Sequence, residues 1–167
     1  MVIFGNRYFL FCSFTLTIMK NLQEWILLLL PAAVGYGVSR VCPMEADAAP
    51  LKAQPPGWVF GVVWPVLYLS IGYCWLMARR SPGMRRAVDI IFIANLISIN
   101  SWIWLYNCKE SKDKALWSFV PSIATAVMMI IVVGNATKSW WPAVLLAPYV
   151  AWLTFASQLN FARVTSI

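Results

Sequence analysis

The chain has 167 residues, of which 61% are hydrophobic and only 11% are charged, and its net charge is +7. A soluble domain carries roughly 25% charged residues, so this composition excludes an ordinary water-soluble fold. Basic residues are expected at the edges of membrane helices, and we therefore expect no nucleic-acid binding. The sequence has no histidine, which removes histidine-ligated haem, most zinc sites and histidine-based acid–base catalysis.

The first 19 residues are expected to lie outside the membrane fold. Their uncharged run, Tyr8 to Met19, has only 12 residues. It is too short to span a bilayer and resembles a signal-peptide core, although no small-x-small cleavage site follows. Met19 is an alternative start of the chain. We treat residues 1–19 as an N-terminal extension whose presence in the mature protein stays open, and residues 20–167 as the membrane domain.

Five apolar segments follow, and each can cross a membrane as a helix. A helix rises about 1.5 Å per residue, so roughly 20 residues cross a bilayer core of about 30 Å. The first segment has an uncharged stretch of only 15 residues, but its flanking Lys20 and Arg40 can reach the headgroups. The sequence therefore predicts an all-α integral membrane bundle with spans at about residues 22–41, 58–78, 89–108, 115–134 and 140–162.

The connections between these spans are short except the first, which is rich in proline, alanine and charge and is typical of a lid or binding loop. The two sides of the membrane would hold 7 and 6 basic residues, which leaves the orientation nearly undecided. The cluster Arg79, Arg80, Arg85 and Arg86 favours a cytoplasmic second loop.

Cysteine chemistry is also left open by the sequence. The four cysteines, Cys12, Cys42, Cys74 and Cys108, include no C-x-x-C pair. Cys42 and Cys108 fall near the same membrane edge, so a disulfide between them is conceivable. We favour free thiols over this bond.

Asparagines within the spans orient the predicted helices. An amide is costly to leave unpaired in a membrane, so such residues face the bundle interior. Asn95 and Asn100 lie in the third span, and Asn160 lies near the end of the fifth. Because residues four apart share a helix face, we expect Trp104 to point inward with Asn100, and Trp152 to point inward with Asn160.

The second span carries an aromatic stripe with the same spacing, formed by Phe60, Trp64 and Tyr68. Such stripes can line a cavity or fill a core, and periodicity leaves the two alternatives even. Tryptophans nearer the span ends are interpreted as interfacial anchors; they are Trp25, Trp58, Trp117, Trp140 and Trp141. In the fifth span, a ladder of small residues permits close approach of a helix from the same bundle or from a second protomer; it consists of Ala143, Ala147 and Ala151.

Two motifs resemble the TspO/MBR family of translocator proteins and tryptophan-rich sensory proteins. They are PPGWVFGVVWPVLYLSIGY, residues 55–73, and PYVAWLTFASQLNF, residues 148–161. The resemblance covers about residues 22–163. It implies a five-helix membrane bundle, often dimeric, that binds porphyrins and, in animals, cholesterol and benzodiazepine-type ligands. It further implies the outer mitochondrial membrane for a eukaryotic source and a bacterial membrane otherwise.

The resemblance and the inward faces together define a predicted ligand pocket. Matching positions carry over six residues, namely Phe60, Trp64, Trp152, Ala156, Leu159 and Asn160. The helix faces add Tyr68, Asn100 and Trp104, and in the third span Trp102 is the alternative to Trp104 for the tryptophan of the family. We predict no catalytic residue and no metal ligand.

Two departures from the family pattern bear on the ligand. Ala53 stands where the family usually has a tryptophan before the paired prolines, which weakens the transfer of the light-dependent porphyrin breakdown known in some bacterial members. The C-terminal sterol pattern has Phe161 in place of tyrosine, so sterol binding is less well supported than porphyrin binding.

We therefore expect a membrane translocator or receptor for flat hydrophobic ligands, such as protoporphyrin IX, with a role in tetrapyrrole or sterol transport or its regulation. No cofactor is required, and porphyrin is a ligand. Two alternatives stay open. One is a light- and oxygen-dependent porphyrin-degrading enzyme, and the other is a structural scaffold whose core is filled.

Overall fold

The computed structural model of the protein describes residues 5–43 and 54–165, and side chains from residue 22 onward within these ranges. Every described element is helical. The elements are α1 (Gly5–Val41), α2 (Gly57–Arg79), a 3-10 turn η1 (Pro82–Met84), α3 (Arg85–Ile103), a π-helical turn η2 (Trp104–Cys108), α4 (Lys112–Thr137), α5 (Trp140–Val144) and α6 (Ala147–Thr165).

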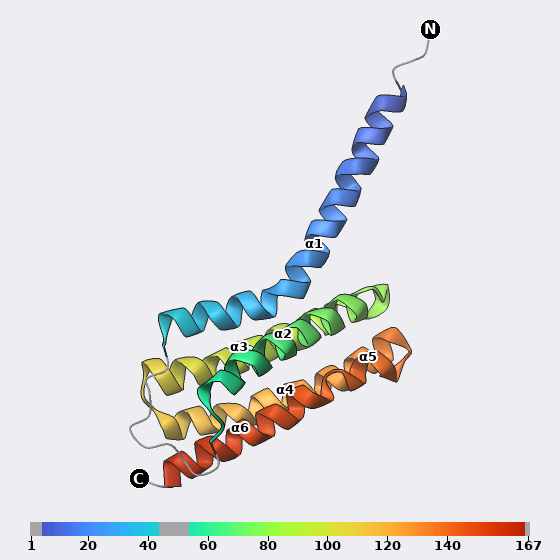
Figure 1. Ribbon diagram of the computed structural model, residues 1–167. Coiled ribbons are helices and arrows are strands. Elements are labelled where there is room, and N and C mark those ends of the chain that lie inside the picture. Colours follow the sequence, from blue (N-terminus) through green and yellow to red (C-terminus); the bar gives the residue numbers. More distant parts are fainter. Residues whose placement is uncertain (1–4, 44–53, 166–167) are drawn as a thin grey trace.

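Five stretches are long and apolar enough to span a membrane, which confirms the predicted all-α membrane bundle. They are Leu22–Val41, Gly57–Arg79, Pro82–Cys108, Lys112–Thr137 and Trp140–Thr165. Their bounds agree with the predicted spans within a few residues, except that the third begins earlier, at Pro82. Helix α1 begins at Gly5 and runs without a break into the first span, and Figure 1 shows its N-terminal part leading away from the other helices. The division at residue 19 stays a prediction.

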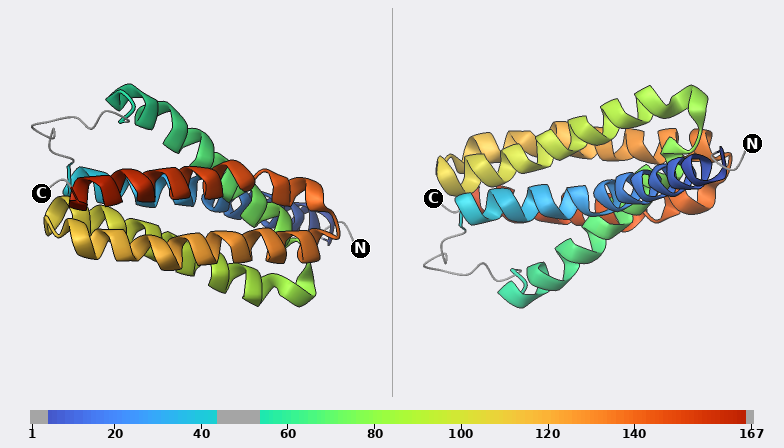
Figure 2. Two further views of the ribbon diagram at one scale, coloured as in Figure 1. Left: turned by 90° about the horizontal axis from the view of Figure 1, so that it is seen from below. Right: turned by 90° about the horizontal axis from the view of Figure 1, so that it is seen from above.

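Helix α4 packs against α2, α3, α5 and α6, whereas α1 packs mainly on α2 and also on α3. Figures 1 and 2 show the helices lying side by side along one direction, apart from the outward N-terminal part of α1 and the splayed N-terminal end of α2. The close approach of α1 and α2 requires Gly72, because a Cβ there would collide with the backbone of Leu28.

A buried polar network joins three of the helices at Asn95, whose side chain is fully buried. Its amide nitrogen donates to the Ser122 carbonyl at 3.0 Å and to the Thr125 hydroxyl at 2.9 Å, both on α4. Its amide oxygen accepts a hydrogen bond of 2.9 Å from the hydroxyl of Tyr149 on α6. Asn100 and Asn160 are buried as well. The prediction that these three asparagines face the interior is confirmed.

The five tryptophans interpreted as anchors all lie on the outer surface, with exposed fractions between 60% and 74%. Two of them, Trp140 and Trp141, belong to the short helix α5. Their outward direction agrees with the prediction that they contact lipid headgroups rather than the core.

The fifth span is interrupted, a feature that its apolar pattern does not predict. Helix α5 ends at Val144 and α6 begins at Ala147, with a turn between them. Pro148 has no N–H and cannot donate to the carbonyl four residues earlier, so a continuous helix is disfavoured here. The predicted small-residue ladder is divided as a result. Ala143 is buried in α5, whereas Ala147 and Ala151 are exposed on α6.

The preference for free thiols was wrong for two of the cysteines. Cys42 and Cys108 form a disulfide with their Cα atoms 5.1 Å apart, which is an ordinary separation for such a bond. The side chain of Asn107 donates to the Cys42 carbonyl at 3.0 Å, so the end of α1 and the turn η2 are already held together beside the bond. Cys74 is a buried free thiol.

Candidate ligand-binding pocket

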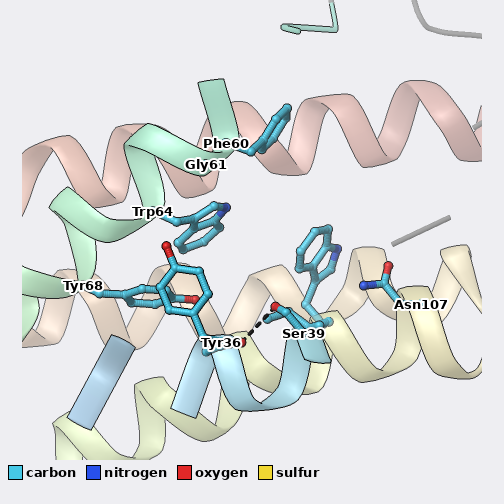
Figure 3. A pocket seen from close by; sticks show the side chains of 10 residues that line it. Tyr36, Ser39, Phe60, Gly61, Trp64, Tyr68 and Asn107 are labelled. Carbon is cyan, nitrogen blue, oxygen red and sulfur yellow. Dashed lines mark hydrogen bonds between the residues drawn. The ribbon is translucent and has the colours of Figure 1, made fainter. Parts of the chain in front are cut away.

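A cavity of about 190 Å³ lies between α1, the first half of α2 and the end of the third span. We call it the aromatic pocket. Figure 3 shows rings from α1 and α2 facing each other across it. Its lining consists of Gly35, Tyr36, Ser39, Phe60, Gly61, Trp64, Tyr68, Trp102, Ile103 and Asn107.

The predicted stripe of α2 forms one wall of this pocket. Trp64 and Tyr68 stack with their ring centroids 5.3 Å apart. Behind them, Trp152 of α6 meets Trp64 edge-on at 6.5 Å and Phe60 edge-on at 5.4 Å. The four side chains form one connected aromatic cluster, and three of them face the cavity. The inward direction of the stripe is confirmed, whereas its contact with a ligand stays a prediction.

Helix α1 supplies the facing wall, which the predicted site residues do not include. A Cβ at Gly35 would overlap the ring of Tyr68, so only glycine allows this ring to lie flat against α1. Tyr36 packs edge-on against Tyr68 at 6.2 Å. Ser39 donates to the Gly35 carbonyl at 2.9 Å, drawn as a dashed line in Figure 3. The signal that could have indicated this wall is the GYG segment, since glycines inside a span permit a close approach.

The third span contributes Trp102 to the pocket and not Trp104. Trp104 is 46% exposed, and the ammonium group of Lys109 lies 5.0 Å from the centre of its ring. The prediction that Trp104 points inward is wrong: Trp104 is the first residue of the π-helical turn η2 and lies outside the buried face of the third span. A step of four residues also rotates an α-helix by about 40° more than one full turn. Two such steps lead from the buried Leu96 through Asn100 to Trp104, and the accumulated rotation carries the ring out of the interior.

Trp102 lies on the inward side of the same helix. Its ring packs against Phe119 of α4 at 5.5 Å and against Tyr106 at 5.4 Å. The sequence left open which of the two tryptophans lines the pocket, and the structure shows that it is Trp102.

The remaining predicted residues lie inside the bundle but outside the lining of this cavity. Ala156 and Asn160 are buried on α6, Leu159 is half-buried beside them, and Asn100 is buried on α3. The side-chain nitrogen of Asn160 donates to the Lys112 carbonyl at the start of α4, at 3.0 Å. The structure thus brings Phe60, Trp64 and Tyr68 to the cavity, with Trp152 in contact with them.

Four buried polar atoms of α3 and α6 have no hydrogen-bond partner among the described residues. Two are donors, the indole nitrogens of Trp102 and Trp152, and two are acceptors, the amide oxygens of Asn100 and Asn160. Each unpaired buried group costs roughly 1–3 kcal/mol, so such groups call for an explanation, such as a partner from outside the protein. Among the described side chains, no three cysteine, aspartate or glutamate residues gather as metal ligands would.

The amino-acid sequence of the chain is similar to those of known proteins. The model of the TspO/MBR family matches residues 26–165. The chain is 29% identical to the "Translocator protein homolog" of Schizosaccharomyces pombe over 151 residues, which cover 81% of this chain and 87% of that protein. It is 30% identical to the "Translocator protein" of Ovis aries, covering 65% of each chain.

An archaeal protein is similar as well. The chain is 28% identical to the "Tryptophan-rich protein TspO" of Archaeoglobus fulgidus, covering 65% of this chain and 69% of that protein. The family match extends over most of the chain and reaches into all five apolar spans. The protein is therefore an integral membrane protein that belongs to the TspO/MBR family.

Proposed function

We propose that this protein binds a flat hydrophobic ligand with polar groups at its centre and edge, a porphyrin such as protoporphyrin IX, and thereby takes part in tetrapyrrole transport or its regulation. The observation that carries this proposal is the aromatic wall together with two unpaired indole donors, that of Trp102, which lines the cavity, and that of Trp152, which contacts the wall.

The chemistry of a porphyrin fits both parts of this site. Its ring offers a large π face to Trp64 and Tyr68, and an offset-stacked pair contributes about 0.5–1.5 kcal/mol beyond the burial of area. Its carboxylates accept hydrogen bonds, as the indole N–H groups of Trp102 and Trp152 require. The unpaired amide oxygens of Asn100 and Asn160 lie outside the lining of the cavity and are not assigned to the ligand. A sterol has a single hydroxyl and satisfies only part of this set, so a porphyrin is favoured over a sterol.

The size of the cavity sets a condition on binding. A volume of about 190 Å³ is below the roughly 300–1,000 Å³ of ordinary ligand sites. A porphyrin must therefore separate α1 from α2 or extend past Gly61, where an added Cβ would meet no atom within 4 Å. Figure 2 shows the N-terminal end of α2 splayed from the bundle.

Absorbance titration of the purified protein in lipid nanodiscs with protoporphyrin IX tests the assignment. We expect Trp64→Ala and Trp152→Ala each to weaken binding about tenfold, through lost stacking and burial. Trp117→Ala is the matched control, because this tryptophan is 73% exposed on the outer surface. Unchanged binding in both pocket variants would refute the site. A parallel titration with a fluorescent sterol compares the two ligand classes.

A light- and oxygen-dependent porphyrin-degrading enzyme is the second candidate, supported by the oxidisable rings of Trp64, Tyr68 and Trp152 in mutual contact. Illumination of the bound porphyrin under oxygen would then bleach it faster than free porphyrin. Equal bleaching rates would exclude this activity.

We also propose an orientation and a location. A disulfide persists on the oxidising side of a membrane, and the Cys42–Cys108 bond lies at the end of the bundle opposite the arginine-rich second loop. Both features favour a second loop in the cytoplasm. The outer mitochondrial membrane is proposed for a eukaryotic source and a bacterial membrane otherwise, and a homodimer is proposed from the family resemblance.

A further inference from the structure

A second cavity of about 190 Å³ lies at the other end of the bundle, away from the aromatic pocket. The start of the first span, the end of α2 and the start of α3 enclose it. We call it the basic cavity, defined by Glu24, Leu27, Leu76, Arg79, Arg80 and Arg85. Its lining combines guanidinium groups with two leucine side chains, whereas the first pocket is aromatic.

One of its arginines is neutralised within the protein. Arg79 forms an ion pair of 2.8 Å with Asp89. The indole nitrogen of Trp75 donates to the same carboxylate at 2.8 Å. Asp89 is therefore fully engaged, and its negative charge does not offset the other arginines.

The other two arginines of the cavity keep most of their positive charge, as does the neighbouring Arg86. Arg80 lies 3.7 Å from Glu24 in a partly exposed pair, which is weak in such surroundings. Arg85 donates through its Nε to the Arg79 carbonyl at 3.4 Å. Neither Arg85 nor Arg86 forms an ion pair within the described part of the chain. The three arginines of the cavity thus meet two carboxylates, Asp89 and Glu24, and the surplus is one positive charge.

The start of α3 adds to this positive field. The first turn holds Arg85 and Arg86, contains no acidic residue, and receives no side-chain cap from Met84. The N-terminus of a helix already carries partial positive charge and unpaired N–H groups, so cations in the first turn are unfavourable. A bound anion would offset both sources of positive charge.

The position of the cavity indicates the source of that anion. Trp140 and Trp141 are exposed at the same end of the bundle, as expected at the headgroup level. Leu27 and Leu76 give the cavity an apolar side. In the orientation proposed above, this end lies in the cytoplasmic leaflet, where anionic lipids are found.

We propose that the basic cavity binds an anionic phospholipid, with its phosphate between Arg80 and Arg85 and the start of an acyl chain against Leu27 and Leu76. Glu24 opposes the anion and limits the affinity. The site is separate from the porphyrin pocket, so the two proposals can fail independently. Simple interfacial anchoring by the same arginines would require no discrete site and no preference among anions.

Native mass spectrometry of the purified full chain tests the proposal by measuring retention of phosphatidylglycerol against phosphatidylcholine with the same acyl chains. We expect about a fivefold loss of preference per arginine removed, so Arg80→Gln with Arg85→Gln lowers it about 25-fold. The matched control removes two charges at the other end of the bundle, by Arg40→Gln with Lys114→Gln, and should leave the preference unchanged. Glu24→Gln should raise it, an effect that a damaged fold would not produce.

Three outcomes would overturn the proposal. They are a double arginine variant that behaves like the control, a Glu24→Gln variant that binds no more phosphatidylglycerol, and displacement of the lipid by millimolar inorganic phosphate. The melting temperature of each variant in detergent checks that the fold is intact without relying on the porphyrin proposal.

Discussion

Replacing Asn95 with leucine removes the hydrogen bonds that join α3 to α4 and α6. The substitution leaves the buried hydroxyl of Tyr149 without its partner, whereas the Ser122 carbonyl still accepts from the Thr125 hydroxyl at 3.1 Å. An unsatisfied buried group costs roughly 1–3 kcal/mol, so we expect a loss of about 1–3 kcal/mol in the free energy of unfolding. Hydrogen bonds between membrane helices contribute on average about 0.6 kcal/mol to stability. The loss expected here is larger because the substitution leaves a buried polar group unpaired.

A double-mutant cycle with Tyr149→Phe measures this directly. The phenylalanine variant alone leaves one acceptor of Asn95 unpaired, and we expect it to cost about 1 kcal/mol. In the double variant both polar partners are gone, so the combined loss should be smaller than the sum of the single losses by about 1 kcal/mol or more. Reversible unfolding in mixed detergent micelles gives the four free energies. Additive losses would refute the reasoning, and Ser98→Ala, which removes only a bond within α3, is the control.

Three further predictions concern the aromatic pocket and its mouth. Gly35→Ala should abolish high-affinity porphyrin binding because the new methyl group displaces the ring of Tyr68. Gly37→Ala is the control: a methyl group at this position meets no atom within 4 Å, so this variant should bind porphyrin normally in the same titration. Trp102→Phe should weaken porphyrin binding severalfold, and Trp104→Phe should not; the reverse result would contradict the inward direction of the first ring. Reduction of the interhelical disulfide should lower the free energy of unfolding by about 2–4 kcal/mol, and an unchanged melting temperature under reducing conditions would contradict this role.

The sequence by itself determined the class of fold, the number of spans and much of the inward surface. These features depend on local properties, namely the length of apolar runs and the direction of side chains along a single helix. The stripe of Phe60, Trp64 and Tyr68 lies where its spacing predicts, and Asn95 is buried because a membrane offers an amide no other partner. The motif at residues 55–73 also sufficed to indicate the family, because its residue types and their spacing are specific without any knowledge of how the helices pack.

The tertiary structure alone decided which segments meet. The Cys42–Cys108 bond joins residues 66 positions apart. No local sequence pattern predicts that the end of α1 and the end of the third span lie next to each other. The choice of Trp102 over Trp104 depends on how α3 is rotated against its neighbours, because a four-residue stripe drifts around the helix over two turns. The basic cavity likewise exists only because α1, α2 and α3 converge at one end. Such features depend on packing between distant segments, which the periodicity of a single helix does not encode.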